Sequence, residues 1–130
     1  AGLGVPREEI AGAVERVTAA LAQTLEDERG RWLLGPHPQA RCELRLTGVL
    51  DGKRVDAVMD RTFVDEKGVR WIVDYKTGAH EGAGVEDFLD RERERYSPQL
   101  ARYAALMRGL DERLVRLGLY FPLLKGWREW

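Results

Sequence analysis

The chain has 130 residues and a mass of 14.8 kDa, which is the size of one domain and excludes a complete helicase, polymerase or multidomain motor. Hydrophobic residues make up 44% of the chain and charged residues 33%, so it can build a core and is not disordered by composition. Its 21 basic and 22 acidic residues leave a formal charge of −1, so net charge neither predicts nor excludes a polyanionic partner. A nucleic-acid partner has to be argued from a site.

The compartment follows from cysteine usage and from the apolar runs. Cys42 is the single cysteine, so no internal disulfide is possible, and no Cys/His spacing typical of zinc sites occurs. No apolar run approaches the roughly 20 residues that cross a bilayer. We therefore expect a cytoplasmic protein with no membrane partner. The chain begins at Ala1 with neither an initiator Met nor a basic signal segment, so we expect residues 1–130 to be a single domain cut from a longer protein.

The first predicted element is a helix over residues 7–29. Its apolar residues are spaced by four, three, four and four positions, which places them on one helical face. They are Ile10, Val14, Val17, Leu21 and Leu25. Gly30 is typical of the position just after a helix, and the prolines and glycine in 31–38 predict a loop.

Three strands are predicted next, over residues 41–49, 54–64 and 69–76, joined by hairpin turns at 50–53 and 65–68. A glycine-rich loop over 77–84 leads to a charged, solvated helical segment over 85–96. Ser97 and Pro98 have the pattern of an N-cap and a first helical residue, so a separate helix should begin there and end at Gly109. A buried strand over 114–121 and an edge strand over 126–130 complete an α-β-β-β-α-β order.

The segment that carries chemistry is the end of the third predicted strand. Asp74 and Lys76 are two residues apart and therefore point to the same side. Alone, such a pair is usually a salt bridge. The preceding strand carries Asp60, which lies about as far from the 65–68 turn as Asp74 does, so the two acids should face each other. Like charges about 5 Å apart are destabilising, but a bound divalent cation, which prefers carboxylate and carbonyl oxygens, removes that objection.

These residues resemble the PD-(D/E)xK nuclease superfamily, whose signature is an acid followed, after a spacer, by acid-x-Lys. The Asp74-Tyr75-Lys76-Thr77 strand end and a following helix with Gln99 and Tyr103 resemble the RecB branch, found at the C-terminal end of RecB- and AddA-type helicase-nucleases. Gln99 and Tyr103 are four apart and share a helix face. The resemblance spans roughly residues 43–103.

The resemblance implies an α/β fold with a restriction-endonuclease-like α-β-β-β-α-β core, a mixed sheet flanked by helices, and Mg²⁺ or Mn²⁺ as cofactor. It makes Asp60 and Asp74 metal ligands, the Tyr75 backbone carbonyl a further ligand and Lys76 the catalytic lysine. Gln99 and Tyr103 are then expected to support the site or to contact the nucleic-acid backbone. Glu43, on the first strand, is a secondary candidate whose alternative role is that of a solvent-facing strand residue.

One departure concerns histidine. The RecB branch usually has an upstream histidine ligand, but His37 and His80 do not lie in that context, so we assign both to the surface. We expect truncation to account for the missing histidine. Two alternatives stay open: a nuclease-like fold retained as a DNA-binding or scaffolding module, and a self-contained structure-specific endonuclease in which an acid such as Glu15 or Glu26 replaces the histidine.

The resemblance also predicts the biological setting. We expect a metal-dependent deoxyribonuclease, an exonuclease rather than an endonuclease, that acts in DNA repair and recombination. Its expected partners are DNA, the helicase domain of the same polypeptide and a second helicase-nuclease subunit. Five arginines around the Gln99 helix either belong to a solvated helix surface or follow a phosphate track. They are Arg91, Arg93, Arg95, Arg102 and Arg108.

Overall fold

The computed structural model of the chain describes residues 7–78, 80, 82 and 84–130. The main elements are three helices and five strands, with a short 3₁₀ helix η1 before the last strand. Their bounds are α1 Arg7–Glu26, α2 Glu28–Leu34, β1 Arg41–Leu50, β2 Lys53–Val64, β3 Arg70–Tyr75, α3 Val85–Arg108, β4 Val115–Phe121, η1 Pro122–Leu124 and β5 Gly126–Glu129. No helix among these residues is long and apolar enough to span a membrane.

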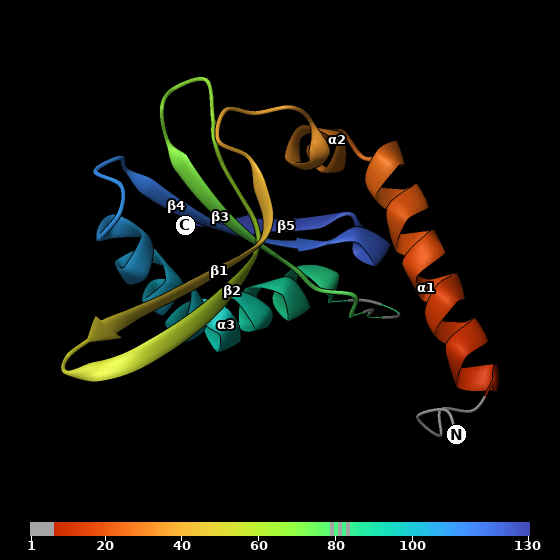
Figure 1. The fold of residues 1–130 in the computed structure, drawn as a ribbon. Coiled ribbons are helices and arrows are strands. Elements are labelled where there is room, and N and C mark those ends of the chain that lie inside the picture. The colour runs from red at the N-terminus through yellow and green to blue at the C-terminus, as the bar shows by residue number, and fades with distance from the viewer. Residues whose placement is uncertain (1–6, 79, 81, 83) are drawn as a thin grey trace.

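The strands form one mixed sheet in the order β1-β2-β3-β4-β5 (Figure 1). β3 and β4 are parallel and joined through α3, whereas the other neighbouring pairs are antiparallel. A long connection between parallel strands is what a crossover helix provides. The predicted α/β fold, a mixed sheet flanked by helices, is therefore confirmed.

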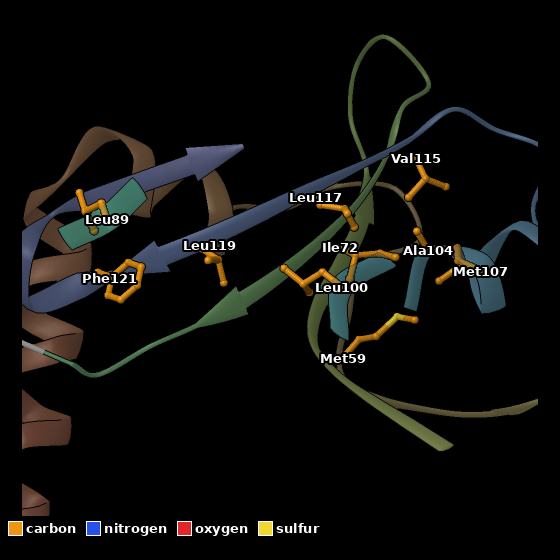
Figure 2. Packing of buried hydrophobic residues seen from close by; sticks show 10 residues of the cluster. All are labelled: Met59, Ile72, Leu89, Leu100, Ala104, Met107, Val115, Leu117, Leu119 and Phe121. Atoms are coloured by element: carbon orange, nitrogen blue, oxygen red, sulfur yellow. The ribbon is translucent and has the colours of Figure 1, made fainter. Parts of the chain in front are cut away.

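β3 is the centre of the sheet and explains why both faces need cover. Its first five residues are buried, and successive side chains point to opposite faces. Ile72 packs into the cluster under α3 shown in Figure 2, together with Leu100 and Leu119. Trp71 and Val73 belong to the cluster on the other face, with Leu33 of α2 at its centre. A strand buried on both faces is a rigid support for residues at its end.

The predicted end of the first helix is wrong. α1 ends at Glu26 and α2 begins at Glu28, so Gly30 lies inside a helix and residues 31–34 are helical rather than looped. A Cβ at Gly30 would lie 2.2 Å from the Thr24 carbonyl oxygen and 2.8 Å from the Tyr120 hydroxyl. Gly30 is thus needed for a close approach of α2 to its neighbours and does not stop the helix.

The apolar stripe of α1 is not buried. Its five apolar residues, from Ile10 to Leu25, keep 51–60% of their surface exposed. The helix instead buries Ala20 and Thr24, and it lies along one side of the molecule in Figure 1. The periodicity predicted the helix correctly but did not determine which side chains pack against the sheet.

The predicted break at Ser97 is also wrong, because α3 runs without interruption through Pro98. An interior proline removes one helix hydrogen bond and costs roughly 3 kcal/mol. The cost is offset because the helix buries Leu89 before the proline and Leu100 and Met107 after it, all against one face of the sheet.

The predicted edge strand is confirmed as β5.

Candidate active site

Asp60 lies where β2 separates from β3. The pairing of the two strands ends at Arg61 and Val73, and the same register places Asp60 opposite Asp74. At that point the Asp60 carboxylate replaces a backbone acceptor, because its Oδ2 accepts a 2.8 Å hydrogen bond from the Tyr75 N–H. β2 continues beyond this point paired only with β1. The acid therefore closes the β2–β3 ladder and stays beside the end of β3.

Asp74 and Lys76 are held at the same strand end. Asp74 is 8% exposed, and Lys76 Nζ lies 2.7 Å from its Oδ2. Apart from this ion pair, Asp74 Oδ2 is buried without a hydrogen-bond partner among the described residues. The backbone N–H of Lys76 donates to the Tyr120 carbonyl at 2.9 Å, so pairing with β4 fixes where the lysine leaves the sheet.

The electrostatics show that the two acids converge. Burial, followed by a hydrogen bond to Asp74 and the charge of that residue, raises the pKa of Asp60 to about 6. Burial lowers the pKa of Lys76, but its hydrogen bond to Asp74 and the charge of that carboxylate outweigh burial and leave the pKa raised. The Lys76 ammonium ion thus pairs with Asp74 and acts on Asp60 only through its charge, so the negative charge of the two carboxyl groups is only partly compensated.

α3 contributes Tyr96 to this cluster. Lys76 Nζ lies 3.9 Å from the centroid of the Tyr96 ring, within the range of a cation–π contact. Gln99 and Tyr103 lie further along the same helix and are half-buried, and Tyr103 packs against the core with Tyr96. Among the described residues, neither Gln99 nor Tyr103 is hydrogen-bonded to Asp60, Asp74 or Lys76, so their predicted supporting role remains a proposal.

The secondary acids do not join the pair. Glu43 lies between Cys42 and Leu44, which pair with Arg61 and Met59 of β2, but it is exposed and has a φ of 51°. Within the described part of the chain, no group of three or more His, Cys, Asp or Glu side chains is placed to hold a metal ion. Glu15 is exposed on α1, and Glu26 pairs with Lys125 at 3.5 Å.

Both histidines are half-buried and stack on aromatic rings. The His37 ring stacks on Phe63 at 4.1 Å, and its Nε2 lies 2.5 Å from the Trp32 carbonyl oxygen. His80 stacks on Phe88 of α3 at 5.0 Å. Both rings are packed and only partly exposed, which differs from the predicted surface position, and the prediction that neither is a metal ligand stays a prediction.

The residues present fit a hard divalent cation. Asp60 and Asp74 offer carboxylate oxygens from adjacent strands, and the buried Asp74 Oδ2 has Lys76 Nζ as its one close polar neighbour among the described residues. The backbone between Asp74 and Lys76 offers the Tyr75 carbonyl. Oxygen donors of this kind are preferred by Mg²⁺ and Mn²⁺. These three groups would hold the ion, with water completing its coordination.

Tyr96 is the residue that the sequence interpretation missed. It precedes Gln99 by three positions and Tyr103 by seven, so all three lie on one face of a continuous helix. The Ser97-Pro98 pair predicts a helix start, which leaves Tyr96 outside the helix of Gln99 and Tyr103. The spacing of Tyr96, Gln99 and Tyr103 was the signal in the sequence that could have placed Tyr96 on this helix face.

The sheet order, the crossover helix and the acids at the end of β3 define a restriction-endonuclease-like α/β domain. The chain matches the PD-(D/E)XK nuclease superfamily model over residues 3–125, and it belongs to that superfamily, whose members are generally nucleases. No curated protein matches the chain.

Proposed function

We propose that the chain is a divalent-metal-dependent deoxyribonuclease of the RecB type that hydrolyses DNA phosphodiester bonds, with Mg²⁺ or Mn²⁺ as cofactor. It acts as an exonuclease in DNA repair and recombination. Its cytoplasmic partners are a helicase domain of the same polypeptide and a second helicase-nuclease subunit. These finer assignments follow from the resemblance of the Asp74-Tyr75-Lys76-Thr77 strand end, Gln99 and Tyr103 to the RecB branch.

The observation that carries the proposal is the convergence of Asp60, Asp74 and Lys76 at the end of β3. A fold gains nothing in stability from two neighbouring carboxylates that share one ammonium ion, since burying a charge without full compensation is costly. An arrangement of this kind is typical of a site that binds a cation.

The roles of the chain's own groups follow from their chemistry. Asp60 and Asp74 bind the ion, which when present lowers the pKa of a water molecule and stabilises charge on phosphoryl oxygens. Lys76 has a raised pKa and is therefore charged at neutral pH. It acts as a cation beside the scissile phosphate, stabilising the charge that grows in the transition state, and not as a proton acceptor. The Asp60 bond to the Tyr75 N–H orients one carboxylate before the ion arrives.

The test measures cleavage of single-stranded and duplex DNA with Mg²⁺ or Mn²⁺. We expect wild-type protein to cleave, and Asp74→Asn and Lys76→Met to reduce the rate of cleavage by at least about 10³-fold. Lys67→Met is the matched control, because Lys67 is an exposed lysine in the β2–β3 turn. Mn²⁺ binding, measured by calorimetry, gives a second readout: Asp74→Asn should weaken it while Lys76→Met retains it. Cleavage that persists in both site variants would contradict the assignment.

A DNA-binding or scaffolding module is the second candidate. It is favoured by the observation that only two carboxylates converge within the described residues. It predicts DNA binding that is independent of Mg²⁺ and unchanged in Asp74→Asn, with no cleavage by wild-type protein. A gel-shift series with EDTA and with Mg²⁺ separates the two functions.

A further inference from the structure

The Lys76 ammonium group is held from two sides. Its Nζ lies 2.7 Å from Asp74 Oδ2 and 3.9 Å from the centroid of the Tyr96 ring, and 25% of the side chain is exposed. Asp74 comes from the same strand, whereas Tyr96 comes from α3, which packs over one face of the sheet. The lysine is therefore the point at which the helix contacts the charged end of β3.

The two partners of Lys76, Asp74 and Tyr96, differ in whether they can bind a metal ion at the same time. Asp74 is also a proposed cation ligand, so any oxygen that it gives to an ion is less available to the ammonium group. A lysine has four flexible methylene groups and no fixed geometry of its own. The face of an aromatic ring attracts an ammonium ion through its quadrupole and uses no carboxylate oxygen. Tyr96 can therefore hold Lys76 in place while Asp74 serves another partner.

We propose that Tyr96 is a positioning residue for Lys76, acting through the face of its ring; the inference rests on the proposed nuclease function. The hydroxyl group of Tyr96 is not required, because the contact is to the ring. The prediction is specific: the rate of cleavage follows the electron density of the ring at position 96 and not its hydrogen-bonding capacity.

The test replaces Tyr96 in the whole chain with phenylalanine and with phenylalanines that carry one, two or three fluorine atoms. Fluorine withdraws electron density from the ring while changing its volume little. We expect Tyr96→Phe to cleave DNA within about threefold of wild type, and kcat to fall stepwise with each fluorine while KM stays constant. Across the series the fall should reach about 5- to 30-fold, the rate equivalent of 1–2 kcal/mol. Equal rates across the series would overturn the inference.

Two controls separate this result from other causes. Arg95 also lies over the Tyr96 ring, at 5.2 Å, so Arg95→Gln should leave the fluorine dependence unchanged. A dependence that disappears in Arg95→Gln assigns the effect to Arg95 and contradicts the inference. In a Lys76→Met background, the residual rate should no longer respond to fluorine, as expected for two residues that act through one contact.

The failures of the two proposals are distinguishable. If Lys76→Met cleaves DNA like wild type, the proposed catalytic site is wrong. If Lys76→Met is inactive but the fluorine series is flat, only the role of Tyr96 is wrong.

A readout that does not depend on activity is the NMR chemical shift of the Lys76 methylene protons next to Nζ. The ring should move these signals upfield in wild type and in Tyr96→Phe, and Tyr96→Leu should restore ordinary values. Ordinary shifts in wild type would overturn the inference independently of cleavage.

Discussion

Both ends of β3 carry buried charge, but the two ends differ in how completely that charge is paired. At the start of the strand, Arg70 Nε donates to Asp111 Oδ2 at 3.0 Å, and Nη2 lies at the same distance. The same guanidinium donates to Gln39 Oε1 at 2.5 Å. Asp111 Oδ1 in turn accepts hydrogen bonds from the backbone and side chain of Arg113. The buried pair of Arg70 and Asp111 is therefore balanced in charge, and Arg113, whose side chain is 41% exposed, adds a partly solvated charge beside Asp111.

At the other end of β3, the acids outnumber the bases. Lys76 is the base beside Asp60 and Asp74 and pairs with Asp74, and the pKa of Asp60 is raised to about 6 by burial and by Asp74. The pKa of Asp111 shifts the opposite way, because its hydrogen bond to the Arg113 N–H lowers it more than burial raises it. Balanced charge is what a fold needs, while unbalanced charge beside a rigid strand is what a binding site needs.

The largest expected effect tests the unbalanced end. Lys76→Met should reduce DNA cleavage by at least about 10³-fold, since a charge aimed at the transition state contributes about that much. Asp74→Asn should reduce cleavage by a similar factor and change the free energy of unfolding little, because losing the repulsion with Asp60 offsets losing the ion pair with Lys76. Cleavage assays and urea unfolding on the same preparations provide the measurement. A large loss of stability in Asp74→Asn would show that this end is structural.

The balanced end should respond in the opposite manner. Arg70→Met leaves the Asp111 carboxylate and the Gln39 side chain without their buried partner, so we expect the free energy of unfolding to fall by about 3 kcal/mol. Cleavage per folded molecule should not change, because the pair lies at the opposite end of β3. Urea unfolding measures the first quantity and active-site titration the second. Loss of cleavage in a folded Arg70→Met protein would contradict the division between the two ends.

The next expected effect is a pH dependence of stability that comes from Asp60 at the unbalanced end of β3. In the folded protein the pKa of Asp60 is raised from 3.8 to about 6, so between these values the folded state binds more protons than the unfolded state. Stability of the metal-free protein should therefore fall as pH rises from about 4 to 6 and then level off. Asp60→Asn should abolish this slope and be about 1–2 kcal/mol more stable above pH 7, a figure reduced for solvent screening. Thermal unfolding in EDTA across pH 4–8 measures both; a slope that persists in Asp60→Asn would assign it to another group.

The sequence predicted the acids better than their surroundings. Counting back from the 65–68 turn placed Asp60 opposite Asp74, because a tight turn fixes the register of an antiparallel pair. It could not show that β2 leaves β3 just there, or that the Asp60 side chain accepts the Tyr75 N–H. Strand separation depends on tertiary contacts that local alternation does not encode.

The helices also show that local sequence signals do not capture long-range packing. Local signals predicted α1 and α3 but not α2. Pro98 indicated a start where α3 is continuous, and Gly30 indicated a stop inside α2. In each case long-range packing outweighs the local preference: burial of Leu100 on the sheet sustains α3, and contact with Tyr120 requires the glycine. The missed role of Tyr96 follows directly from the misplaced helix start.

The smallest expected effect provides the reference for the Arg70 result. Arg54 and Asp56 form an ion pair at 3.3 Å near the β1–β2 turn, with side chains 74% and 65% exposed. Exposed pairs of this kind contribute little, because water solvates both charges and salt screens them. Arg54→Met should therefore change the free energy of unfolding by less than about 0.5 kcal/mol, and raising NaCl to 1 M should erase even that difference. The same salt step should leave most of the Arg70→Met loss, since that pair is buried. If both variants lose similar stability, burial does not distinguish the ion pairs, and the loss in Arg70→Met has to be assigned to its packing instead of its charge.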